Sequence, residues 1–412
     1  MPTQIPFGVA DYFWGEAFAR QQLLNDLLET FRRWGYGDVI SPVFEYAETL
    51  SVQASEALQA EMYRFLDRDG RTLALRPEFT TQVARLVGVR LHDWPMPQRF
   101  CYGGSCFRYV DPQAGRQREF WQAGLELIGA SSPAGDAEVL ALTAEALRVA
   151  GLEQFRIVLG QTSFFAGLLA ELSLTEEQER ALRWAIERKS EPALAAFLQQ
   201  TPLATGQRQA VEALPQLAGA DVDGVIRHAE RHARNHVMHS ALADLRAIAQ
   251  AVDAYGELDV LVLDLTEIRN LGYYTGISFE ALVPEVGAPV GSGGRYDGLV
   301  GQFGPPQPAV GVALGVDRLL LARQRQTGAD SGMAHPQPPD AVARVHGSAA
   351  ALAAVRGLRA AGQRIQVELE DRPLEQVCAY AARVGVKTVL DWDGEEFVVY
   401  KDEGRGFVMR NA

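Results

Sequence analysis

The chain has 412 residues, 47% apolar and 22% charged, a balance typical of globular rather than disordered proteins. This length exceeds what one hydrophobic core usually supports, so we expect one large domain and one small one. Acidic residues (52) outnumber basic residues (39) by 13, which argues mildly against nucleic-acid binding, because such binding depends on neutralising phosphates with Lys and Arg.

Helical and strand patterns alternate in the N-terminal half. Apolar residues recur at helical spacing over Phe18–Trp34, and the glycines at 35 and 37 end that helix. Strands are predicted over Asp38–Phe44, Tyr63–Leu75 (as a hairpin), Phe100–Tyr109 and Glu119–Ile128. A helix over Ala134–Ala150 follows, and residues 165–255 are almost wholly helical in pattern.

The C-terminal part adds further strands and a separate small domain. Strand patterns return at Leu258–Leu265, Tyr273–Val283 and Pro308–Leu314. Residues 327–340 have the Gly- and Pro-rich composition of a linker. Beyond them a helix, a strand, a helix and a strand are predicted over Ala349–Ala361, Gln363–Leu369, Pro373–Val384 and Lys387–Asp391. This pattern predicts a core over 1–326 and a small α/β domain over 341–412.

Signals for export, membrane insertion and disulfides are missing from the sequence. No segment offers the about 20 uninterrupted apolar residues of a membrane span, and the N-terminus does not resemble a secretory signal. Cys101, Cys106 and Cys378 are too few for a disulfide framework and lack CxxC spacing. We therefore expect a cytoplasmic protein without membrane association.

Four polar clusters fall on or beside predicted strands. They contribute Arg76, Glu78, Thr80 and Gln82; Arg108, Arg116, Arg118, Gln122 and Glu126; Arg269, Tyr273 and Tyr274; and Arg295 and Tyr296. Because side chains alternate along a strand, Gln122 and Glu126 share one face with Gly124 between them. Carboxylates suit ammonium or N–H donors and arginines suit carboxylates, so the clusters predict an amino-acid pocket.

The same residues also allow structural interpretations. Gln122 and Glu126 are equally compatible with the solvated face of a half-exposed sheet. Arg295 and Tyr296, in a Gly-rich turn, more often have structural roles. The histidines at 228, 232 and 236 have i, i+4 spacing that can bind a metal, but about 6 Å of helix separates successive side chains. We interpret them as a solvated helix face, and we expect no metal and no cofactor.

Several strings resemble the catalytic core of histidyl-tRNA synthetase, including motifs 2 and 3 of the class II fold: PQAGRQREFWQAGLELIG, YYTGISFE, GGRYDGL and PAVGVALGVDRLLLA. The resemblance covers nearly the whole chain. It implies an α+β fold in which a class II aminoacyl-tRNA synthetase-like antiparallel sheet is flanked by helices. It also implies a helical insertion at about 165–255 and a small C-terminal α/β domain that resembles a shortened anticodon-binding domain.

Two families share this core: the synthetase itself, and the regulatory subunit of ATP phosphoribosyltransferase, its paralogue. The strings LALRPEFTTQVARL and DLTEIRNLGYYTGISFEALVP resemble the regulatory family. Where synthetases usually read LVRGLDYY, this chain reads EIRNLGYY, with Glu267, Asn270 and Gly272 at the changed positions. Val110 stands where synthetases place a glutamate near the adenine amino group, and valine cannot accept that hydrogen bond.

Other features bear on ATP and tRNA. Arg108, Arg269 and Arg318 match arginines that synthetases use chiefly for ATP; the first two could instead hold a histidine carboxylate, and we interpret the third as a packing or salt-bridge relic. The last 73 residues carry 10 basic and 11 acidic side chains. RNA-binding domains usually present a basic face, so this balance favours an appendix that no longer binds tRNA.

The resemblance to the regulatory family implies a non-catalytic subunit that mediates feedback inhibition of histidine biosynthesis by L-histidine. It implies a histidine pocket formed by Glu78, Thr80, Arg108, Gln122, Glu126, Arg269, Tyr273 and Tyr274. In this pocket Glu126 would accept from the imidazole and Glu78 from the ammonium group. The implied partner is a short-form catalytic subunit, in a hetero-oligomer within which the class II core forms a homodimer. The alternative is a histidyl-tRNA synthetase that uses ATP and Mg²⁺.

Overall fold

The computed structural model describes residues 4–111, 117–268, 273–328, 338–404 and 406–410. Arg116 and Arg269 lie outside these described residues. The chain divides into two compact units, the first formed by residues 1–11 and 20–329 and the second by residues 12–19 and 330–412. Within the described ranges, no helix is long and apolar enough to cross a membrane.

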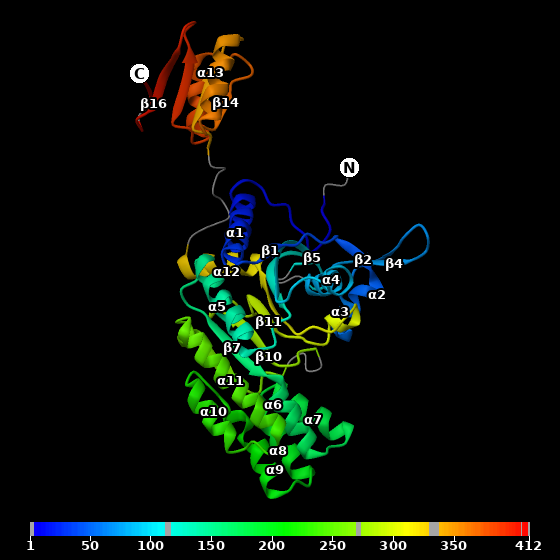
Figure 1. The fold of residues 1–412 in the computed structure, drawn as a ribbon. Helices are drawn as coiled ribbons and strands as arrows, with labels where there is room; N and C mark the ends of the chain where they lie inside the picture. The colour runs from blue at the N-terminus through cyan, green and yellow to red at the C-terminus, as the bar shows by residue number, and fades with distance from the viewer. Residues whose placement is uncertain (1–3, 112–116, 269–272, 329–337, 405, 411–412) are drawn as a thin grey trace. The chain divides into compact units, whose positions relative to one another are not determined.

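The first unit is built on a nine-stranded, mostly antiparallel sheet (Figure 1). The strands, in their spatial order, are β1 (Gly37–Asp38), β5 (Gln98–Phe107), β6 (Glu119–Ile128), β12 (Ala309–Gly315), β11 (Gly291–Arg295), β10 (Ile277–Leu282), β7 (Arg156–Gln161), β9 (Leu261–Asp264) and β8 (Ala218–Gly219). Only the β1–β5 and β7–β9 pairs of this sheet are parallel among the described residues.

Helices cover one face of this sheet and enclose the main hydrophobic core. They are α1 (Trp14–Arg33), α5 (Pro133–Val149) and α12 (Val316–Thr327). The predicted helical region at 165–255 contains α6 (Thr162–Leu172), α7 (Glu176–Glu187), α8 (Glu191–Gln200), α9 (Thr205–Ala213), α10 (Val222–Glu230) and α11 (His236–Ala254). Ala123, Leu125 and Leu127 of β6 point into this core, which confirms the predicted alternation along the strand.

The opposite face of the sheet carries a second, smaller core that includes Phe79, Val83, Tyr102 and Leu299. It packs under α4 (Thr80–Leu86), a π-helix (Val87–Leu91) and a 3₁₀ helix (Val300–Gln302). Beside it is a three-stranded sheet of β2 (Phe44–Tyr46), β4 (Thr72–Leu75) and β3 (Arg64–Leu66), with α2 (Ala47–Leu50) and α3 (Glu56–Ala60). The β3–β4 hairpin confirms the prediction for Tyr63–Leu75.

The predicted strand over Asp38–Phe44 is wrong in its middle, because β1 ends at Asp38 and β2 begins at Phe44. Pro42 has no backbone N–H for a strand ladder. The carbonyls of Ser41 and Pro42 accept from the side chains of Arg76 and Gln82 instead.

Strand β11 was not predicted, because three of its five residues are glycines, which are uncommon in strands. A Cβ at Gly293 would lie 2.3 Å from a backbone oxygen of β12, so this strand pairing requires glycine there.

The second unit contains a five-stranded sheet in the order β14 (Ile365–Val367), β13 (Ala341–Arg344), β15 (Thr388–Trp392), β16 (Phe397–Asp402) and β17 (Phe407–Arg410). The first three strands are parallel, and the last two form an antiparallel extension that the sequence analysis missed. Helices α13 (Ala349–Ala360) and α14 (Leu374–Arg383) close two separate small cores, as the predicted strand–helix alternation implies.

Candidate functional site

A cavity of about 490 Å³ lies on the helix-poor face of the nine-stranded sheet. Its floor is formed by small residues of β11 and β12, among them Ser292, Gly293, Gly311 and Ala313, and this lack of bulk creates the space. Seven of the eight predicted site residues line it: Glu78, Thr80, Arg108, Gln122, Glu126, Tyr273 and Tyr274. The eighth, Arg269, lies outside the described residues.

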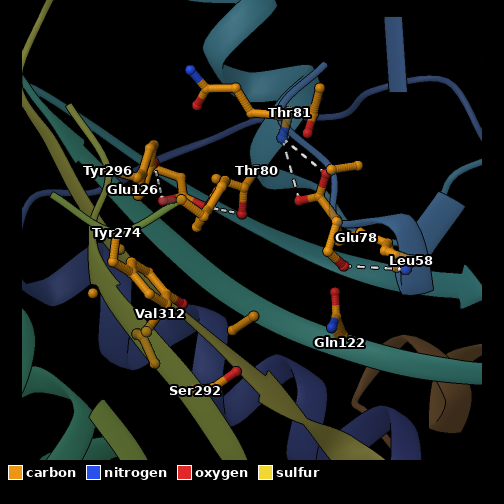
Figure 2. Close-up of a pocket in the computed structure, with 18 of the residues that line it drawn as sticks. Leu58, Glu78, Thr80, Thr81, Gln122, Glu126, Tyr274, Ser292, Tyr296 and Val312 are labelled. Carbon is orange, nitrogen blue, oxygen red and sulfur yellow. Dashed lines mark hydrogen bonds between the residues drawn. The ribbon is translucent and has the colours of Figure 1, made fainter. Parts of the chain in front are cut away.

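Glu126 is the most buried acid of the cavity, with 1% of its surface exposed. Its Oε1 accepts from the Thr80 hydroxyl at 2.7 Å and from the Tyr102 hydroxyl at 3.0 Å. Its Oε2 accepts from the Tyr296 hydroxyl (Figure 2). Since Gln122 is also 91% buried, the alternative of a solvated sheet face is wrong for both residues.

Burial raises the pKa of Glu126 to about 7. The three hydroxyl donors oppose this shift, because they stabilise the charged carboxylate, and the nearby Glu78 carboxylate adds to it. Burial likewise raises the pKa of Tyr102, Tyr273 and Tyr296 well above the ordinary value, so these hydroxyls remain neutral donors. A ligand therefore meets a carboxyl that titrates near neutral pH among neutral phenols.

Glu78 provides the second acidic group of the cavity. Both of its carboxylate oxygens accept from the backbone N–H of Thr81, at 3.1 and 3.3 Å, which holds the side chain at the first turn of α4. In the view of Figure 2, Thr80 lies between Glu126 and Glu78, with Tyr274 on the Glu126 side and Gln122 on the Glu78 side. Such a fixed carboxylate is suited to an ammonium group.

Gln122 is oriented by a buried thiol. Cys106 Sγ donates to Gln122 Oε1 at 3.2 Å, and burial raises the Cys106 pKa to about 12, so the sulfur keeps its proton. This leaves the N–H groups of the Gln122 amide as the part of the side chain that can donate. Arg108, which also lines the cavity, is anchored through Nε to the Pro77 carbonyl at 3.0 Å. Its remaining guanidinium donors suit a carboxylate.

Tyrosine rings form the aromatic wall of the cavity. The rings of Tyr273 and Tyr296 stack with centroids 5.8 Å apart, and Tyr274 meets Tyr273 edge-on at 5.0 Å. A planar ring ligand would fit between such walls and the carboxylate of Glu126.

An adjoining cavity of about 270 Å³ shares Arg108, Gln122, Ser292 and Ala313 with the first. Phe120, Val110, Asp317 and Arg318 are among its other lining residues. Val110 is 6% exposed and contributes only apolar side-chain surface. Arg318 donates to the Pro289 carbonyl at 2.6 Å, and Asp317 accepts from the Trp121 backbone N–H and pairs with Arg20. Both charged groups thus hold elements of the fold together.

Other predicted cluster residues within the described ranges have structural contacts. Arg76 donates to the carbonyls of Ser41 and Ser105, and Gln82 to that of Pro42. Arg295 forms a buried ion pair with Asp136 at 2.8 Å, which confirms its structural interpretation, whereas its neighbour Tyr296 lines the cavity. The predicted single helix face for the histidines at 228, 232 and 236 is wrong, because α10 ends at Glu230, α11 begins at His236, and His232 lies between them. Among the described residues, no group of three His, Cys, Asp or Glu side chains is placed to hold a metal.

Sequence reasoning missed Tyr102 and the role of Tyr296 at Glu126. Tyr102 comes from β5 opposite Gly124, whose missing side chain leaves room for the phenol: a Cβ there would lie 2.5 Å from the Tyr102 oxygen. Gly311 of β12 lies opposite Glu126 for the same reason. The glycines at 124 and 311 were the signal available in the sequence. Only the register between strands shows that Gly124 lies opposite Tyr102 and Gly311 opposite Glu126.

Comparisons with known proteins show the family of this chain. The family model of histidyl-tRNA synthetase matches residues 8–319. The ATP phosphoribosyltransferase regulatory subunit of Moorella thermoacetica is 41% identical over 96% of this chain and 99% of its own length. That of Symbiobacterium thermophilum is 38% identical over 94% and 96%.

Solved structures show the same relationship. A Bacillus halodurans protein described as an ATP phosphoribosyltransferase regulatory subunit/histidyl-tRNA synthetase has a TM-score of 0.82 at 28% identity, over 95% of this chain and 97% of that one. Histidyl-tRNA synthetase of Nostoc sp. PCC 7120 shares the fold, with a TM-score of 0.79 at 20% identity over 100% and 97%. The chain has a class II synthetase-like fold and belongs to the ATP phosphoribosyltransferase regulatory subunits within the histidyl-tRNA synthetase family.

Proposed function

We propose that this chain is the non-catalytic regulatory subunit of an ATP phosphoribosyltransferase and that L-histidine, bound in the 490 Å³ cavity, is its inhibitory effector. The observation that carries the proposal is the constellation around Glu126. A buried carboxyl, a second carboxylate, an amide, an arginine and three tyrosines surround a space suited to a small amino acid with a polar ring.

Each end of histidine has a suitable partner in this cavity. The imidazole ring lies between the tyrosine walls and donates to Glu126. The ammonium group binds Glu78, and the carboxylate binds Arg108, with Gln122 as a further donor. Arg269 remains a proposed second partner of the carboxylate. Thr80 acts through Glu126, whose Oε1 it holds.

The adjoining cavity supports the non-catalytic part of the proposal. The Val110 side chain in its wall offers no acceptor for an adenine amino group at the position where synthetases place a glutamate. Arg108 and Arg318 are the features that favour the alternative, a synthetase that activates histidine with ATP, because they line this cavity.

The proposal includes a short-form catalytic subunit as the partner and a homodimer of this chain in the hetero-oligomer. Histidine inhibits only if it binds the inhibited state of that complex more tightly than the active state. The similarity to regulatory subunits over nearly the full chain supports this assignment.

To test the proposal, the full chain is mixed with a short-form catalytic subunit, and the rate of phosphoribosyl transfer to ATP is measured as a function of histidine concentration. We expect activation by this chain and inhibition by histidine, and loss of inhibition with intact assembly in Glu126→Ala. Glu176→Ala, an exposed acid on α7, is the matched control and should respond as wild type. Robust histidine-dependent ATP–pyrophosphate exchange by the chain alone would establish the synthetase alternative instead.

A further inference from the structure

The Glu126 carboxylate has one acceptor position left for a ligand. Thr80 and Tyr102 occupy both lone pairs of Oε1, and Tyr296 occupies one of the two on Oε2. Gly311 is essential to this arrangement, because a Cβ there would lie 1.8 Å from Oε2. A ligand can therefore form at most one further hydrogen bond with Glu126, at Oε2.

The described charges that line the cavity with Glu126 do not balance, since three carboxyl groups accompany one guanidinium group. The groups that face or surround it are Glu78 and Thr80 at the start of α4, Tyr102 on β5, Tyr296 after β11, Tyr273 and Tyr274, with Glu61 and Arg108 elsewhere on the lining. When a zwitterionic amino acid binds, its ammonium group pairs with Glu78 and its carboxylate with Arg108. Among the residues that the structure describes, the charge of Glu126 is then left over, buried and without a cation.

A single proton removes this imbalance in either of two places. On the ligand ring it makes an imidazolium whose N–H donates to the ionised Oε2. On the carboxyl it makes an O–H that donates to the bare nitrogen of a neutral ring. With two protons, an imidazolium N–H would face the O–H of a protonated Glu126, and two donors would oppose each other. Without any proton, the ionised Glu126 would stay buried with no compensating charge.

We infer that histidine binds with one proton shared between its imidazole ring and the Glu126 carboxyl, so that its affinity passes through a maximum close to neutral pH. The inference rests on the proposed function for the identity of the ligand. It adds a regulatory property of the same site, a linkage between effector binding and pH.

The expected size of the effect follows from the two free groups. The Glu126 pKa is about 7, and that of a free imidazole is about 6.5. Both groups are nearly deprotonated at about pH 8.3 and nearly protonated at about pH 5.2. Binding should then take up close to one proton at the higher pH and release close to one at the lower. Affinity should fall about tenfold at each extreme from its value near pH 6.8.

The experiment is titration calorimetry of L-histidine into the full chain at these three pH values, each in two buffers of different ionisation enthalpy. The dependence of the heat on the buffer gives the number of protons exchanged. Glu126→Gln should bind more weakly and take up no proton at pH 8.3, because an amide does not titrate. Glu78→Gln, the matched control in the same cavity, should also bind more weakly but should keep the proton uptake.

The outcomes separate the inference from the proposed function. Histidine binding with no proton exchange at pH 8.3 and a flat affinity profile would overturn the inference and leave the proposed function standing. Failure of histidine to bind at all three pH values would overturn both. Proton exchange and affinity of the wild-type chain at the three pH values test the inference even if Glu126→Gln fails to fold.

Discussion

Replacement of Glu126 by glutamine should stabilise the ligand-free protein at alkaline pH. The folded chain holds this carboxyl at a pKa of about 7, against an ordinary value of 4.5. Between these values the folded state keeps a proton that the unfolded chain has released, so stability contributed by the group is present below pH 4.5 and is lost as the pH rises to about 7. Glutamine preserves the shape and the acceptor for Thr80 and Tyr102, and it does not titrate.

The size of the effect follows from the shift in pKa. A difference of about 2.5 units corresponds to about 3 kcal/mol of unfolding free energy above pH 7, since each unit is worth about 1.4 kcal/mol. The glutamine variant should therefore be up to about 3 kcal/mol more stable than wild type at pH 8, with the difference shrinking toward pH 4.5. The same residue should be required for histidine binding, so stability would rise while function falls.

Urea unfolding of the full chain from pH 4.5 to 8.5 measures this difference. Comparison of wild type with Glu126→Gln isolates the group from other acids that titrate in this range, such as Asp136, whose pKa burial raises to about 6. Glu176→Gln on the exposed surface of α7 should follow the wild-type curve. Parallel curves for wild type and Glu126→Gln over the whole range would refute the reasoning.

Three further substitutions or reactions test other parts of the structure. Gly311→Ala should cost about 1–3 kcal/mol of stability and abolish histidine binding, because its Cβ would overlap Glu126 Oε2. Gly287→Ala, whose Cβ would have nothing within 4 Å, should be near neutral in urea unfolding, and equal stabilities of the two variants would contradict the assigned β6–β12 register. Arg295→Met should destabilise the first unit by about 3–5 kcal/mol, because it leaves Asp136 buried without its partner. The double variant Arg295→Met with Asp136→Leu should recover much of this loss, and an equally unstable double variant would show that the broken ion pair is not the cause of the destabilisation. In the native protein a thiol reagent should modify the half-buried Cys378 first, because Cys101 and Cys106 are fully buried. Rapid modification of all three cysteines in a spectrophotometric assay would contradict the burial of Cys101 and Cys106.

Local patterns predicted much of the secondary structure. Glu119–Ile128 was predicted as a strand with the bounds that β6 has, and the helical region at 165–255 contains most of α6 and all of α7 to α11, with a 3₁₀ helix and the two-residue strand β8 between α9 and α10. Such patterns succeed where apolar periodicity and end signals agree. They failed at Pro42, where side chains take the place of a strand ladder, and at β11, where glycine replaces the usual strand residues.

The sequence by itself determined that Gln122 and Glu126 share one strand face, because side chains alternate along a strand, and its motifs indicated the two families that share this core. Only the tertiary structure decided how those groups are tuned. Residues 80, 102 and 296 come from three distant parts of the chain, and their hydroxyls meet at one carboxylate only through the tertiary fold: the β5–β6 register places Tyr102, and Thr80 comes from helix α4. Burial then shifts the titration of Glu126 toward neutral pH, which depends on the surrounding packing and not on any local pattern.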